Sequence, residues 1–169
     1  SISTALDEVV SQDTTTTVVV ASVPSLIVGQ SVAFTASVDA NTSGSGAPTG
    51  TVSFYDATTL LGTITITDCR ASLTTSNLAV GSHPIIAVYE GDANHATSAS
   101  TILSQTIEQD TTTVVVSSAI TSGFAQQVTF TAVITTGTSG SGTPSGTVSF
   151  YDDETLLATA TVIGSTASY

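Results

Sequence analysis

The chain has 169 residues and a formal net charge of -12, because 13 acidic side chains stand against one basic side chain and there is no lysine. Nucleic acids and anionic membranes are bound mainly through clusters of lysine and arginine, so this composition excludes both as partners. Hydrophobic residues make up 40% of the chain, and its many valine, isoleucine and threonine residues exclude disorder and predict a β fold.

The N-terminal third of the chain predicts three strands. Residues 1–12 mix apolar and polar residues, and a β-branched run follows at Thr14–Ala21, ended by Pro24 and Gly29. Apolar and polar residues then alternate with period two over residues 29–39, which indicates a strand with one buried face. The side chains that this alternation places in the core are Val32, Phe34, Ala36 and Val38.

A loop rich in glycine and serine at 41–48 leads into further predicted strands, separated by turn residues. We expect these strands at 50–56, 59–67, 71–78, 84–90 and 97–107. About seven strands without helical spacing, in a module of about 100 residues, predict two antiparallel sheets packed face to face. The expected architecture is therefore an immunoglobulin-like Greek-key sandwich.

The chain also repeats itself at an offset of 96 residues, since the stretch GTVSFYD at 50–56 returns unchanged at 146–152. After a one-residue slip in the threonine run, residues 1–12 align with the end of the module. We therefore expect tandem all-β, immunoglobulin-like sandwiches. The predicted parts are the terminal strand of a preceding module at 1–12, a complete module at 13–109 and the N-terminal part of a second module at 110–169.

Four motifs resemble the bacterial Ig-like repeat family, which occurs in tandem on very large surface and secreted proteins. They are the opening TTTTVVV, PTGTVSFYD at 48–56, TLLGT at 59–63 and LAVGSHPIIAVYEGDAN at 78–94. The resemblance covers essentially the whole chain and implies a stalk, spacer or adhesin module outside the cell, without catalytic residues of its own. Two departures from the family pattern are His95, which stands where an aromatic residue is usual after GDAN, and Pro84 after His83.

These observations predict a non-catalytic structural module of an extracellular array, forming a stalk, fibre or filament at the cell surface. Its expected partners are copies of itself or neighbouring modules, because Glu108, Gln109 and Asp110 join two modules without a flexible linker. Enzymatic chemistry is not expected, since the Gly-Ser-Gly stretches lack the G-x-S-x-G form and there is no lysine for a Schiff base. No apolar run reaches the length of a membrane span in this segment.

The alternative function is an adhesin module that binds glycan or protein through its end loops. The residues for such a site are His83, Asp92, Asn94 and His95, which could cluster at one end of the sandwich. Sugar sites favour exposed aromatic side chains, and this chain has no tryptophan and only four tyrosines. This composition weighs against the alternative.

Acidic residues at the module junctions raise the question of a metal. Calcium takes six to eight oxygen ligands from clustered carboxylates and carbonyls, and the candidates are Asp13, Glu108 and Asp110. No D-x-D-x-D-G loop is present, so we expect no cofactor and interpret these acids as solvated turn residues. Tyr89 is predicted to be a buried strand tyrosine whose hydroxyl bonds a nearby turn.

Overall fold

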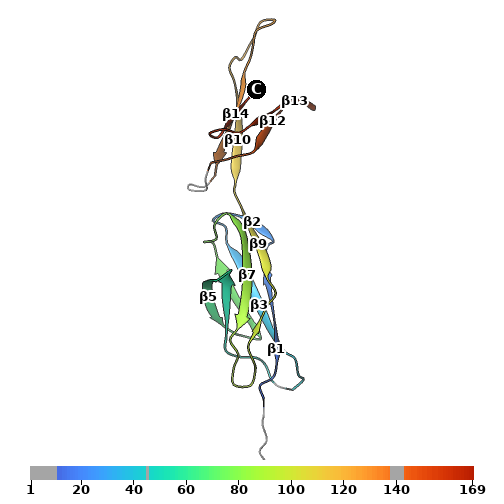
Figure 1. The fold of residues 1–169 in the computed structure, drawn as a ribbon, viewed down its shortest axis with the longest axis vertical. Helices are drawn as coiled ribbons and strands as arrows, with labels where there is room; N and C mark the ends of the chain where they lie inside the picture. The colour runs from blue at the N-terminus through green and yellow to red at the C-terminus, as the bar shows by residue number, and fades with distance from the viewer. Residues whose placement is uncertain (1–10, 45, 138–142) are drawn as a thin grey trace, which may run out of the picture. The chain divides into compact units, whose positions relative to one another are not determined.

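The computed structural model describes residues 11–44, 46–137 and 143–169, and every regular element in these ranges is a β-strand (Figure 1). The chain divides into two compact units, Ser1–Ile107 and Glu108–Tyr169. The prediction of an all-β fold is confirmed. The strand predicted at 1–12 falls almost wholly on residues 1–10, which lie outside the described residues.

Unit 1 consists of two sheets. The first has the order β1-β3-β6, and the second has the order β2-β9-β7-β4-β5, with β8 also paired to β7. Successive strands cross between the sheets, since β3 lies in the first, β4 and β5 in the second, β6 in the first and β7 in the second, as in an immunoglobulin-like sandwich. The bounds are β1 Thr15–Ala21, β2 Ser25–Ile27, β3 Val32–Ala40, β4 Thr51–Asp56, β5 Thr59–Thr65, β6 Arg70–Thr75, β7 Gly81–Tyr89, β8 Ser98–Ala99 and β9 Leu103–Glu108.

The core of unit 1 lies between the two sheets and is built from alternate residues of each strand. All four side chains predicted for the buried face of β3 are at most 1% exposed. They face apolar side chains of the second sheet that are fully buried, namely Val52 and Phe54 of β4 and Ile85, Ala87 and Tyr89 of β7. Period-two patterning therefore located the core, because every second side chain of a strand points to the same face.

Unit 2 repeats five of these strands. Its three-stranded sheet has the order β10-β11-β14, and β12 pairs with β13 as a separate hairpin. By the repeat offset these strands correspond to β1, β3, β6, β4 and β5 of unit 1. No strand described in unit 2 takes the positions of β7, β8 and β9. The bounds are β10 Thr111–Ser117, β11 Phe130–Thr136, β12 Thr147–Asp152, β13 Thr155–Thr161 and β14 Thr166–Ser168.

Two details of unit 1 differ from the predicted elements. The sequence did not predict β2, because its three residues between Pro24 and Gly29 are too few to show periodicity. The strand expected at 97–107 is divided into β8 and β9. Ser100 causes this division, since its backbone nitrogen donates to Ala87 O at 2.9 Å while its hydroxyl accepts from Ala87 N at 3.0 Å.

Candidate functional site

The loop between β7 and β8 is organised by one carboxylate, that of Asp92. Its Oδ2 accepts hydrogen bonds from Thr49 N at 2.8 Å and from Thr49 Oγ1 at 2.7 Å. Its Oδ1 accepts from Asn94 N and from His95 N, both at 2.8 Å. Asp92 therefore closes its own turn and ties this turn to the segment that leads into β4.

His95 completes this turn from inside the fold. Its ring Nδ1 lies 2.8 Å from Asp92 Oδ1, and its backbone oxygen accepts from Asp92 N at 2.9 Å. Since a carboxylate only accepts, Nδ1 carries the proton of this bond. The side chain is 2% exposed, and its Nε2 is buried without a hydrogen-bond partner among the described residues. His95 is therefore a buried part of the loop rather than an exposed ligand.

The environment of Asp92 shifts two pKa values. Burial raises the pKa of the Asp92 carboxyl, but the hydrogen bonds from Thr49, Asn94 and His95 outweigh burial and hold this pKa well below its usual range. Burial and the neighbouring Asp92 carboxylate raise the pKa of Tyr89 to about 12. Tyr89 is fully buried as predicted. Its hydroxyl lies close enough to the Asp92 carboxylate of the turn to interact with it, although no hydrogen bond of ordinary geometry joins this hydroxyl to a partner in the described parts of the chain.

The same loop binds the segment that leads into β1. Asp13 N donates to Asn94 O at 2.8 Å, and Ala96 N donates to Asp13 O at 2.8 Å. Gln12 Nε2 also donates to Asp92 O at 2.7 Å. The Asp13 carboxylate accepts from Thr42 Oγ1 at 2.6 Å. We call this arrangement of residues 12–13 on residues 92–96 the linker clamp, because it fixes the N-terminal connection of the module to the β7–β8 loop.

The fourth predicted site residue, His83, lies elsewhere. It is near the start of β7, whereas the loop of Asp92 follows the end of this nine-residue strand. Its ring Nδ1 lies 2.6 Å from Asp56 Oδ2, and its Nε2 lies 2.8 Å from Ala79 O. The structure therefore brings Asp92, Asn94 and His95 together but places His83 near the other end of β7, which corrects the expected group of four.

The residues proposed for calcium do not form a cluster. No group of three or more His, Cys, Asp or Glu side chains in the described ranges is close enough to hold a metal ion. Asp13 belongs to the linker clamp, and Glu108 and Asp110 are exposed. The expectation of no cofactor, with calcium at the module junctions as the less favoured alternative, is not tested by these contacts.

The sequence did not predict three residues of this site, namely Gln12, Thr49 and Gly50. Gly50 lets the segment of Thr49 approach the β7–β8 loop. Gly50 has a φ of +89°, and a Cβ at this position would lie 2.8 Å from Gly91 O. Glycine is required here by both the backbone conformation and the space. The signal was present in the sequence as the pair TG at 49–50 and GD at 91–92, but only the fold shows that these two turns touch.

The described residues contain no helix that could cross a membrane.

The chain was compared with curated proteins, solved structures and family models. A search of curated proteins found no match. One solved structure, of Clostridium thermocellum CbhA fibronectin(III)-like modules, is 18% identical, covers 89% of this chain and 76% of its own, and has a TM-score of 0.43. The family model for the bacterial Ig-like domain (group 3) matches residues 19–108, which is more than half of the chain. The chain therefore belongs to the bacterial Ig-like domain (group 3) family.

Proposed function

We propose that this chain is a non-catalytic structural segment of an extracellular repeat array that forms a stalk, fibre or filament at the cell surface. The observation that carries the proposal is the linker clamp, because it makes the connection into a module part of that module's own hydrogen-bonded fold. A connection held in this way resists bending more than a free linker does. Stiffness is the property that a stalk or spacer requires.

The short link between the repeats supports the same proposal. Only Gln109 and Asp110 separate β9 from β10, and these residues repeat the Gln12-Asp13 pair of the linker clamp in sequence. The connection between the repeats thus carries the residues that clamp the N-terminal connection of unit 1. We expect the same clamp in each complete module of the array.

Binding of glycan or protein through the β7–β8 loop has less support. The two carboxylate oxygens of Asp92 are occupied by donors from the same module, and His95 is buried. Asn94 uses its backbone oxygen for the linker clamp. These groups act within the fold, so a ligand would have to displace bonds that hold the loop together.

Electron microscopy of the native full-length protein tests the proposal. A stiff array predicts rods with a regular axial repeat of roughly 35 to 45 Å, the length of one sandwich from strand rise and loops. Surface labelling of intact cells with an antibody against unit 1 tests the location. Compact single particles without an axial repeat, or labelling only after cell lysis, would contradict the proposal.

A further inference from the structure

The loop that follows β3 carries an acceptor motif for N-linked glycosylation. Residues 41–43 read NTS, which has the form N-x-S with a middle residue other than proline. The chain has two other asparagines, Asn77 and Asn94, and neither has serine or threonine two positions later. An acid, Asp39, also stands two positions before Asn41, as in the acceptor sites of bacterial glycosylating enzymes. Asn41 is therefore the one asparagine of this sequence in an acceptor motif.

The structure presents this motif to solvent. β3 ends at Ala40, and the three residues at 41–43 are all exposed, as is Asp39. Acceptor sites for glycans lie in surface loops, because the modifying enzyme must reach the amide and the attached sugar must remain in water. The position of Asn41 meets this requirement.

The Asn41 side chain lies against the start of β1. Its Nδ2 donates to Thr14 Oγ1 at 3.0 Å, and its Oδ1 accepts from Thr16 Oγ1 at 2.8 Å. A primary amide has two hydrogens on its nitrogen and one acceptor oxygen. An N-linked sugar replaces one of the hydrogens, so the other still serves Thr14 and the oxygen still serves Thr16. The folded module therefore accommodates the modified side chain in its present place.

The next residue holds the motif on the module. Thr42 N donates to Asp13 Oδ2 at 3.2 Å, and Thr42 Oγ1 donates to Asp13 Oδ1 at 2.6 Å. Asp13 belongs to the linker clamp, so the loop of Asn41 is tied to the N-terminal connection of the module. A glycan on Asn41 is thus attached at a fixed point beside β1.

We propose that Asn41 is a site of N-linked glycosylation and that the attached oligosaccharide shields β1 of unit 1. In the transfer, Asn41 Nδ2 forms a bond to the anomeric carbon of an oligosaccharide carried on a polyprenyl pyrophosphate. The bond from this carbon to the pyrophosphate oxygen breaks, the polyprenyl pyrophosphate leaves with the electron pair, and Nδ2 loses one proton. The proposal rests on the location outside the cell proposed above, since this modification is made on exported protein.

The composition of β1 gives the glycan its role. β1 has the sequence TTTVVVA, without a charged residue, and it stands at the end of the strand order β1-β3-β6. Proteins usually protect such end strands from pairing with other chains by charged side chains. Val18 and Val20 are 49% and 55% exposed, and they share a face of β1 with Thr16 because side chains of a strand alternate. A bulky, solubilising glycan on Asn41 therefore stands beside these valines.

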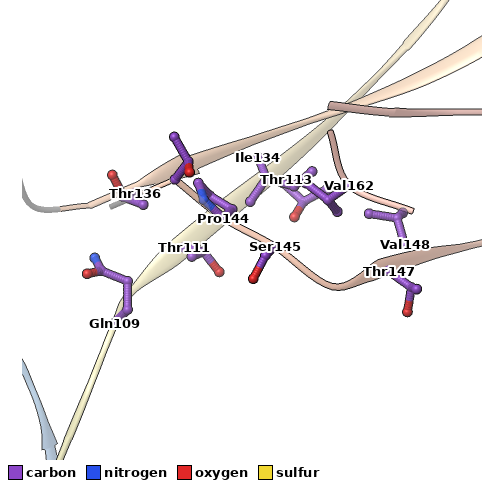
Figure 2. Close-up of a pocket in the computed structure, with 11 residues that line it drawn as sticks. Gln109, Thr111, Thr113, Ile134, Thr136, Pro144, Ser145, Thr147, Val148 and Val162 are labelled. Carbon is purple, nitrogen blue, oxygen red and sulfur yellow. The ribbon is translucent and has the colours of Figure 1, made fainter. Parts of the chain in front are cut away.

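Unit 2 provides a natural comparison. The counterpart of Asn41 is Gly137, although the next two residues are threonine and serine in both repeats. Figure 2 shows this end of unit 2, where Thr111 of β10 pairs with Thr136 of β11. A Cβ on Gly137 would lie 3.2 Å from Asp110 Oδ2, so the space for a larger side chain is restricted. The acceptor is therefore a property of one repeat and not of every module.

Mass spectrometry of the full-length protein purified from its native cells tests the proposal. Cleavage before aspartate releases residues 39–55, which contain Asn41 as their one asparagine, and residues 110–151, which contain Gly137 and no asparagine. We expect fragmentation to place an oligosaccharide mass on Asn41, with no N-linked sugar on residues 110–151. A peptide 39–55 found only without sugar, or with sugar only on its serine and threonine residues, overturns the proposal.

Two substitutions of one exposed residue, expressed in the native cells, separate the motif from the fold. Ser43→Ala removes the hydroxyl that the motif requires and should leave Asn41 unmodified, whereas Ser43→Thr preserves the motif and should keep the sugar. Sugar on Asn41 in both variants would show that the motif does not direct the modification and would overturn the proposal.

Light scattering of the same two proteins measures the shielding. The Ser43→Ala protein should form larger particles than the glycosylated Ser43→Thr protein at equal concentration, because its β1 is uncovered. Adding Val18→Lys to Ser43→Ala should reverse this change, since a charge then protects the strand. Equal scattering by the two proteins would overturn the shielding role.

These results are separate from those that test the array. An unmodified Asn41 overturns glycosylation and leaves an axial repeat seen by electron microscopy unaffected. Compact particles without such a repeat contradict the array and leave a sugar found on Asn41 unaffected.

Discussion

Asp92 illustrates how one side chain can hold a loop and a linker in place. Four backbone or hydroxyl donors and one imidazole nitrogen surround its carboxylate, and its backbone oxygen accepts from Gln12. A charged acceptor makes stronger hydrogen bonds than a neutral one. The effect of this single residue therefore reaches both the β7–β8 loop and the connection that precedes β1.

The variant Asp92→Asn should destabilise unit 1 by about 3 kcal/mol, because an amide presents hydrogens where the carboxylate accepted bonds. Urea unfolding measures this change. The folded-state pKa of Asp92 is lowered from 3.8, so its contribution is present above that value and is lost as the pH falls below it. We expect wild-type stability to fall more steeply than that of the variant below about pH 4.

The matched control is Asp39→Asn, since Asp39 is an exposed residue of β3. It should change the free energy of unfolding by no more than about 0.5 kcal/mol. If the two variants lost the same stability, the hydrogen bonds around Asp92 would not be the reason for its effect.

His83 should give unit 1 a pH dependence of opposite sign. Burial lowers the pKa of its ring, but the bond to Asp56, the bond to Ala79 O and the charge of Asp56 outweigh burial and raise the pKa above 6.5. Both ring nitrogens face oxygen acceptors, which suits the protonated form. The stabilisation is therefore fully present below 6.5 and is lost as the pH rises through the folded-state pKa.

The melting temperature measured between about pH 5 and pH 9 checks this sign. The wild type should lose stability across the upper part of this range relative to His83→Gln, which cannot titrate there. Asp56→Asn should reduce the same slope, because it removes the charged partner. A slope that remains unchanged in both variants would show that other groups cause it.

At the scale of the element, the glycine before β4 and the glycine before β12 form a natural pair. Both have positive φ, +89° for Gly50 and +105° for Gly146. A Cβ on Gly50 would meet Gly91 O at 2.8 Å, whereas a Cβ on Gly146 would have no atom within 4 Å. Within the described ranges, Gly50 lies against another turn and Gly146 does not.

Gly50→Ala should therefore destabilise unit 1 by about 3 kcal/mol or more, from backbone strain together with the displaced β7–β8 turn. Gly146→Ala should cost unit 2 about 1 to 2 kcal/mol, from strain alone. Hydrogen exchange with mass spectrometry reports β4 and β12 separately. Equal losses in the two strands would mean that the contact with Gly91 is not important.

The strands differ in how well the sequence predicted them. β3 was predicted because one of its faces is buried, and burial appears in the sequence as alternation. β4 was predicted from the same alternation, although its polar residue Ser53 is buried as well. β2 was not, because three residues carry no period, and the division of the strand expected at 97–107 into β8 and β9 was not predicted either. The Asp92 site was predicted only in part, since GDANH has the composition of a solvated turn, and its main partner, Thr49, lies 43 residues away in the chain.

For the whole molecule, the two units contain similar residues in unequal surroundings. Unit 1 has both sheets and a closed core, whereas the described strands of unit 2 leave Val115 55% exposed and Phe130 36% exposed. Apolar burial is the main source of folding free energy. Unit 2 should therefore be the less stable of the two, even where the sequences are identical.

Calorimetry of the 169-residue chain should show two unfolding transitions, with unit 2 unfolding at the lower temperature. Phe34→Ala should lower only the upper transition, by about 3 to 4 kcal/mol, because Phe34 is fully buried. Phe130→Ala should affect only the lower transition, by about 1 to 2 kcal/mol, since Phe130 is already 36% exposed. If either variant shifted both transitions together, the units would fold as one cooperative body, and the order of stability inferred from their unequal burial would be wrong.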